Sequence, residues 1–327
     1  MLSFDDFLSQ SAHVAQLRSD FAARTFVHAY LFSGPRGTGK KSVARLCAMA
    51  ALCRAEGGRP CGVCGPCRRI LSGTHPDLHI VVPEKGKKLI GVDVLREVIA
   101  QVGVKSFEGG TKALIFPSAE LMTPAAQNCL LKTLEEPPED TVFFLITDQP
   151  GALLPTIVSR CRVLRFHPLS VAECEKRLIA LGESPADALR RARMAEGCVG
   201  QALEIGGERL DLLAALTKDV FSCRRPADVL AAVNRYKDDR EKHGQIMDLL
   251  ESAVRDVLLA QAGKEPLDGG YAQEAQAYAR AVPLSGGLAL QETITRARMM
   301  LGSNVAFASA FESVLLKISE EYTKWPW

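Results

Sequence analysis

Short runs of apolar residues alternate with helical patterns over the first half of the chain. Five runs are candidate strands, and three stretches between them carry apolar residues at helical spacing. The candidate strands are 29–33, 78–82, 112–116, 142–147 and 162–166, and the candidate helices are 40–52, 94–102 and 125–135. Repeated strand–helix–strand order, with strands that are continuously apolar, predicts an α/β fold in which helices cover a parallel sheet.

The helix predicted over 125–135 has recognisable ends. Thr123 can accept a hydrogen bond from its first amides, and Pro124 suits the first helical position. Pro137 follows the last apolar residue and ends the helix. Asp93 is a candidate cap for the helix before it.

After Pro168 the strand signals fade, and the chain is rich in Ala, Leu, Glu and Arg at helical spacing. Near the end, the spacing of apolar residues predicts one long amphipathic helix through Met300, Phe307, Phe311, Val314 and Ile318. A length of 327 residues favours two or three domains at roughly 150 residues each. We expect an α/β domain over 1–167, a small helical domain over 168–208 and a larger helical domain over 209–327.

The composition is that of a globular protein, 47% hydrophobic and 24% charged. Forty basic and 38 acidic residues give a formal net charge of +2, which excludes a polycation that binds nucleic acid by bulk charge. The first ten residues lack the basic and apolar segments of a secretory signal. Because no apolar run approaches the roughly 18 residues that a membrane helix needs, we expect no membrane partner and a cytoplasmic protein.

Residues 34–40, GPRGTGK, lie between a predicted strand and a predicted helix. In that context a glycine-rich loop can wrap backbone amides around a phosphate, with a lysine reaching the outer phosphates. The candidate nucleotide-binding residues are Gly34, Gly37, Thr38, Gly39 and Lys40. A strand-to-helix turn that binds nothing is the alternative.

The positions that would support ATP hydrolysis are altered. A complete phosphate loop continues with Ser or Thr, which binds Mg²⁺, but Lys41 stands there, and Ser42 lies at least about a quarter-turn further round the helix. The neighbouring strand 112–116 ends in Pro117 and Ser118, where an acidic pair would hold Mg²⁺ and polarise water. The sequence thus leaves open whether the loop binds ATP. The Mg²⁺ site is degraded, and we expect no catalysis from this pocket.

Four of the ten cysteines, Cys53, Cys61, Cys64 and Cys67, fall within residues 53–67. Four thiolates at these spacings suit a tetrahedral metal, and four protein ligands make such a site closed and structural. Zn²⁺ is the expected ion, with an iron–sulfur cluster as the rival. A thioredoxin-like redox pair is less well supported because four cysteines are present rather than two.

Two motifs identify a resemblance to a known family. Residues 130–138, LLKTLEEPP, and residues 156–161, TIVSRC, strongly resemble bacterial clamp-loader AAA+ subunits of DNA polymerase III, and the order of loop, cysteine module and His75-Pro-Asp77 agrees. The resemblance covers residues 1 to about 167 closely. It implies an AAA+ parallel sheet with a zinc-knuckle insertion, followed by a helical lid and an all-α oligomerisation collar.

The resemblance also implies roles. In such assemblies the arginine of SRC, here Arg160, reaches the ATP of a neighbouring subunit as an arginine finger. This chain departs from the motor subunit, gamma/tau, at Lys41, at Pro117-Ser118 and in a lid segment, 197–203, that lacks an arginine. It therefore resembles a stator subunit with gamma/tau and delta as partners, which meets the sliding clamp and primer–template DNA through the complex.

Two other functions remain open from the sequence. One is an active clamp-loader ATPase of the motor type. The other is a zinc-dependent nucleic-acid-binding module, for which the arginines around the cysteines are suggestive: Arg54, Arg59, Arg68 and Arg69. That alternative lacks aromatic residues among the arginines on which bases could stack.

Overall fold

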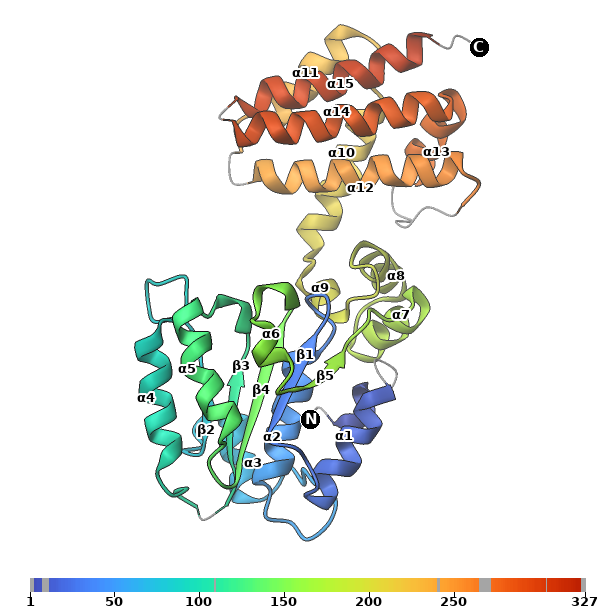
Figure 1. Ribbon diagram of the computed structural model, residues 1–327. Coiled ribbons are helices and arrows are strands. Elements are labelled where there is room, and N and C mark those ends of the chain that lie inside the picture. Colours follow the sequence, from blue (N-terminus) through green and yellow to red (C-terminus); the bar gives the residue numbers. More distant parts are fainter. Residues whose placement is uncertain are drawn as a thin grey trace. The chain divides into compact units, whose positions relative to one another are not determined.

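A computed structural model of the chain describes residues 3–7, 12–108, 110–239, 242–264, 272–303 and 305–324. The chain divides into two compact units (Figure 1). The first consists of Met1–Ser170 with Cys198–Gln201, and the second of Val171–Gly197 with Ala202–Trp327. The predicted division into domains at 167 and 208 stays a prediction.

The first unit is built on a five-stranded sheet in the order β2-β3-β4-β1-β5, and every strand pair in it is parallel. The strands are β1 (Ala29–Ser33), β2 (Leu78–Ile80), β3 (Lys112–Phe116), β4 (Thr141–Thr147) and β5 (Arg162–Arg165). The central strands β1, β3 and β4 are buried throughout, as their continuous hydrophobicity predicted. The predicted α/β class is confirmed.

Helices cover both faces of this sheet (Figure 1). They are α1 (Ala12–Ala23), α2 (Lys40–Leu52), α3 (Gly65–Ser72), α4 (Val92–Gly103), α5 (Pro124–Glu135) and the single turn α6 (Pro155–Val158). Alternate strand residues serve separate cores: Tyr30 and Phe144 pack with α1 and α2, whereas Leu31 and Leu145 pack with α4 and α5. This alternation follows from the two-residue repeat of a strand.

One predicted helix cap is confirmed and one is wrong. The Thr123 side chain accepts a hydrogen bond from the amide of Ala126 at 3.2 Å, and Pro124 opens α5. Asp93 does not cap α4, because that helix begins earlier, with Gly91 as its cap. Asp93 lies instead in the first turn, where a carboxylate is favourable toward the helix dipole.

The described part of the second unit is helical. Its helices include α7 (Val171–Ala180), α8 (Pro185–Met194), α10 (Gly207–Phe221), α11 (Pro226–Tyr236), α12 (His243–Gln261), α13 (Ala272–Ala281), α14 (Leu284–Gly302) and α15 (Phe307–Lys324). The short helix α9 (Val199–Glu204) begins in the segment that belongs to the first unit. Tyr278, Leu290 and Phe311 lie in the main core of the second unit.

The prediction of one long C-terminal helix is wrong. Met300 belongs to α14, which ends at Gly302, and Phe307 begins α15. The amide of Ser303 donates to the carbonyls of Met299 and Met300 and closes the first helix. Met300 and Phe307 are seven positions apart, a spacing that fits a helical repeat and conceals the end of the first helix.

No helix in the described part of the chain is long and apolar enough to span a bilayer.

Candidate functional site

The glycine-rich loop connects β1 to α2, as predicted. Gly34, Gly37 and Gly39 have φ angles of 140°, 80° and 87°, which other residues rarely adopt. A Cβ atom on Gly34 would lie 2.1 Å from the carbonyl oxygen of Phe166. A Cβ atom on Gly37 would lie 2.6 Å from the amide nitrogen of Gln201. The packing of the chain itself therefore requires glycine at these two positions, whether or not a phosphate binds.

The side chain of Lys40 is buried and bonded to its own loop. Its ammonium group donates to the carbonyl oxygens of Gly34 at 2.5 Å and Pro35 at 2.7 Å. Burial lowers the pKa of Lys40, and the nearby carboxylates of Asp148 and Glu120 partly oppose that shift. A lysine that served a phosphate would first have to leave these two carbonyls.

The first residues of α9 form hydrogen bonds with the glycine-rich loop. The amide of Gly200 donates to the carbonyl of Gly37 at 2.8 Å, and the side-chain amide of Gln201 donates to the carbonyl of Arg36 at 2.8 Å. The sequence indicated that this segment lacks an arginine, but gave no sign that it contacts the loop. The contacts hold the loop in its present conformation.

The residues around the loop do not fit a magnesium-bound nucleotide poised for hydrolysis. Lys41 occupies the position of the Mg²⁺-binding hydroxyl, and its side chain is exposed. Strand β3 ends at Phe116 and is followed by Pro117 and Ser118, and Glu120 lies beyond them in a 3-10 turn, Ala119–Leu121. The five loop residues that the sequence singled out lie together, but their role in binding stays a prediction.

Arg160 lies just after α6, on the side of the sheet covered by α5. One guanidinium nitrogen donates to the carbonyl of Thr156 at 3.0 Å, and the other donates to the carboxylate of Glu135 at 2.5 Å. The arginine side chain remains 35% exposed. Because Glu135 is the last residue of α5, this contact joins the LLKTLEEPP motif to the SRC motif.

Sequence reasoning missed Gln127, which holds α5 against the segment leading to Arg160. Its buried side-chain amide donates to the carbonyls of Met122 at 3.2 Å and Ala152 at 3.1 Å. Its oxygen accepts from the amide of Leu154 at 2.8 Å. A glutamine in the middle of an amphipathic helix is the only signal in the sequence, and it does not reveal the partners.

Cys161 follows Arg160 and packs against the core beneath it. Burial raises the pKa of its thiol to about 12, so the group stays protonated and unreactive near neutral pH. Ser159 contributes to the turn by donating from its hydroxyl to the carbonyl of Thr156 at 3.0 Å.

The four predicted cysteines come together between α2 and α3. Their sulfur atoms lie within 4.8 Å of one another, with Cys53 and Cys67 buried and Cys61 and Cys64 partly exposed. Backbone amides of Val63 and Cys64 lower the pKa of Cys61 to about 6, which favours its thiolate. Burial raises the pKa of the Cys53 and Cys67 thiols, so a metal ion that bound there would have to displace their protons. This cluster can hold a metal ion, and its four protein ligands would leave no position open for chemistry.

Comparison with known proteins agrees with this arrangement. A family described as "DNA polymerase III, delta subunit" matches residues 9–170. The DNA polymerase III subunit delta' of Bacillus subtilis is 39% identical over 246 residues, which cover 73% of this chain and 74% of that protein. The chain belongs to the delta' subunits of DNA polymerase III. The resemblance to clamp-loader subunits that its motifs predicted is therefore confirmed at the level of the family.

Two further relatives match over shorter stretches of the chain. The delta' subunit of Pseudomonas aeruginosa is 44% identical over 165 residues, half of each chain. The tau subunit of Bacillus subtilis is 36% identical over 168 residues, 51% of this chain and 29% of that one. Among solved structures, a gamma-subunit-related protein of Thermotoga maritima aligns with 94% of this chain and 99% of its own at 16% identity, with a TM-score of 0.40.

Proposed function

We propose that this delta' chain is a catalytically idle, stator-type subunit of the clamp loader. It supplies Arg160 as an arginine finger to ATP bound by a neighbouring gamma/tau subunit. The observation that carries this proposal is the contrast between two cations. Lys40 is buried and bonded to its own loop, whereas Arg160 lies at the surface with a third of its side chain exposed.

The energetics favour transfer of Arg160 from its present partner to a phosphate. An ion pair as exposed as the one between Arg160 and Glu135 contributes about 1 kcal/mol or less, so releasing the guanidinium costs little. At the γ-phosphate, the same group would stabilise charge that develops in the transition state. Arginine fingers of this kind are worth about a thousandfold or more in rate.

The metal of the cysteine cluster is proposed to be structural Zn²⁺. Zinc–sulfur bonds of about 2.3 Å in a tetrahedron place the sulfur atoms about 3.8 Å apart. The sulfur atoms of Cys53 and Cys64 are 3.8 Å apart in this chain. Zn²⁺ bound there would fasten the loop between α2 and α3 and take no part in catalysis.

The partners follow from the family to which the chain belongs. We propose that gamma/tau and delta subunits flank this chain, and that the sliding clamp and primed DNA are met through the assembled complex. The helical residues 209–327 would form its part of the oligomerisation collar, with 168–208 as the lid and 1–167 as the AAA+ domain.

Reconstitution tests the proposal directly. The chain is mixed with gamma/tau and delta subunits, and the mass of the complex and its ATP turnover are measured with and without the chain. A complex that forms and turns over ATP faster when the chain is present supports the proposal. ATP hydrolysis by the isolated chain that is lost in Lys40→Ala would instead establish the motor-type ATPase.

A further inference from the structure

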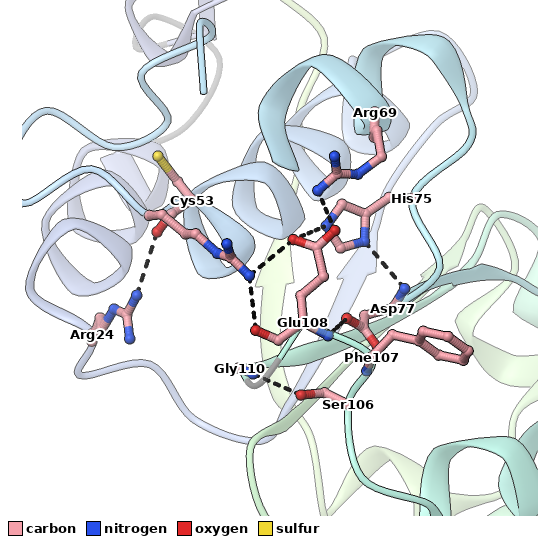
Figure 2. A network of polar contacts seen from close by, with 10 residues as sticks. Arg24, Cys53, Arg69, His75, Asp77, Ser106, Phe107, Glu108 and Gly110 are labelled. Atoms are coloured by element: carbon pink, nitrogen blue, oxygen red, sulfur yellow. Dashed lines mark hydrogen bonds and ion pairs between the residues drawn. The ribbon is translucent and has the colours of Figure 1, made fainter. Parts of the chain in front are cut away.

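One acidic side chain, Glu108, joins two arginines of the cysteine-rich segment 53–69. Its carboxylate pairs with Arg69 (Figure 2) and, at 3.2 Å, with Arg54. The guanidinium of Arg54 also donates to the main-chain carbonyl of Glu108 at 2.8 Å. Glu108 belongs to the loop between α4 and β3, 39 positions after Arg69 and 54 after Arg54. The fold therefore connects this distant loop to the cysteine-rich segment at two points.

Each of the two arginines lies close in the chain to a buried cysteine of the cluster. Arg54 directly follows Cys53, and Arg69 is two residues after Cys67 in α3. Cys53 and Cys67 are the buried members of the cluster, and the other two cysteines are partly exposed. Through the main chain, Glu108 thus helps to hold the two buried sulfur atoms in place.

The main chain at Glu108 is itself anchored to the sheet. The buried carboxylate of Asp77 accepts the amide of Phe107 at 2.8 Å and the amide of Glu108 at 3.2 Å (Figure 2). Asp77 directly precedes β2, and its carbonyl accepts the amide of Ala113 in β3 at 2.9 Å. An ion pair that starts from an anchored main chain loses less entropy when it forms than one on a free loop.

The carboxylate of Glu108 is largely enclosed. Its side chain is 21% exposed, and its Oε2 atom lies 4.0 Å from the imidazole Nε2 of His75, which is buried. In the described part of the chain, neither Arg54 nor Arg69 pairs with any other carboxylate. Loss of the charge on Glu108 would leave both arginines without an acidic partner, and the cysteine-rich segment would lose its tie to the loop.

The cysteines need such support because their charges oppose one another. The four sulfur atoms lie within 4.8 Å of one another, and thiolates this close repel each other until a cation binds between them. Contacts that keep Cys53 and Cys67 together before a metal arrives lower the cost of forming the site. The two ion pairs of Glu108 are contacts of this kind.

We propose that Glu108 is a positioning residue of the cysteine metal site. By holding Arg54 and Arg69, it keeps Cys53 and Cys67 placed for Zn²⁺. Because coupling between two sites is reciprocal, the loop that carries Glu108 is in turn more ordered when the cysteines hold the metal. The inference rests on the proposed Zn²⁺ site and is independent of the proposed roles in ATP turnover.

The test measures the zinc dissociation constant of the full-length chain by competition with a chromophoric chelator. A partly exposed ion pair is worth up to about five-fold in an equilibrium constant, so loss of both pairs in Glu108→Gln should weaken zinc binding by about two-fold to about thirty-fold. The substitution keeps the size of the side chain, and circular dichroism checks that the variant folds.

Glu183→Gln is the matched control. Glu183 pairs with Arg191 at 2.8 Å in the second unit, and its side chain is 25% exposed, close to the value for Glu108. This variant also loses an ion pair of a partly buried glutamate, but it should bind zinc as tightly as the wild type. The comparison separates an effect on the metal site from a general loss of stability.

Two further measurements test the connection itself. Arg69→Gln should also weaken zinc binding, and it should add less than its own effect to Glu108→Gln, because both substitutions remove the same ion pair. In the wild type, removal of zinc should speed hydrogen exchange at the amides of Phe107 and Glu108, which Asp77 accepts. That difference should shrink in Glu108→Gln.

The proposal is overturned if Glu108→Gln binds zinc as tightly as the wild type, if Glu183→Gln weakens zinc binding equally, if the effects of Glu108→Gln and Arg69→Gln add in full, or if exchange in the loop does not respond to zinc. A wild-type chain that binds no zinc would overturn the metal site itself and this proposal with it.

Discussion

The guanidinium of Arg160 donates a hydrogen bond to the carboxylate of Glu135, which lies 25 residues earlier in the chain. The contact joins the segment after α6 to the last residue of α5. It leaves a third of the arginine side chain exposed and about half of the glutamate. The contact with Glu135 orients the guanidinium. Because the pair is exposed and weak, the guanidinium remains able to leave Glu135 and bind another group.

Replacing Glu135 should have little effect on stability. In Glu135→Gln we expect the free energy of unfolding to fall by about 1 kcal/mol or less, because exposed ion pairs are weak. Urea unfolding measures this, with Glu136→Gln as a matched exposed control. A loss greater than about 2 kcal/mol would mean that the pair is part of the folded core rather than a releasable tether.

Replacing Gln127 should cost much more. Gln127→Leu leaves the amide of Leu154 and the carbonyls of Met122 and Ala152 without their partner, and each unpaired buried group costs about 1–3 kcal/mol. We expect a fall of about 3 kcal/mol in the free energy of unfolding. Asn128→Leu, at the next and exposed position, is the control and should change it by about 0.5 kcal/mol or less. Equal stabilities of the two variants would contradict the assignment of Gln127 as the residue that holds this segment.

The glycine-rich loop should depend on Gly34 even without nucleotide. Gly34→Ala combines an unfavourable φ of 140° with a clash against the Phe166 carbonyl. We expect the substitution to lower the free energy of unfolding by about 1–3 kcal/mol or more, and the melting temperature to fall with it. Gly57→Ala, where a Cβ meets nothing within 4 Å, should melt like the wild type. If the two variants melt alike in the absence of ATP, packing does not explain the glycine at position 34.

The cysteine cluster should hold one metal ion per chain. In Cys64→Ser we expect the metal content, measured by inductively coupled plasma mass spectrometry, to fall well below one and the melting temperature to drop, because a structural metal contributes to folding. Cys129→Ser, outside the cluster, should keep its metal. Native protein without zinc or iron would end the assignment of this cluster as a metal site.

Much of the fold follows from local pattern. The buried strands β1, β3 and β4 are continuous apolar runs, and their positions could be predicted closely. The edge strand β2 ends at Ile80, two residues earlier than predicted, although the amide of Val81 still donates to the carbonyl of Ile115 in β3. Pro83 follows the apolar run and has no amide hydrogen to continue the pairing. Helix ends were harder to predict, as Asp93 and Met300 show, because an acceptable cap or repeat occurs at more than one position.

Part of the candidate site could likewise be predicted from local sequence pattern, and part of it could not. The glycine loop, the four cysteines and Arg160 are visible as motifs because their residues lie close together in the sequence. Contacts between distant segments leave no such pattern. Gln201 reaches Arg36 across 165 positions, and Arg54 reaches Glu108 across 54.

ATP turnover of the reconstituted complex containing Arg160→Ala, compared with one containing Lys40→Ala, tests the central claim most directly. Both complexes should assemble with the mass of the wild type. We expect DNA-stimulated turnover to fall in Arg160→Ala, with about a thousandfold loss at the neighbouring site that the finger serves, and to stay at the wild-type rate in Lys40→Ala. Undiminished turnover in Arg160→Ala, together with a loss in Lys40→Ala, would contradict the account.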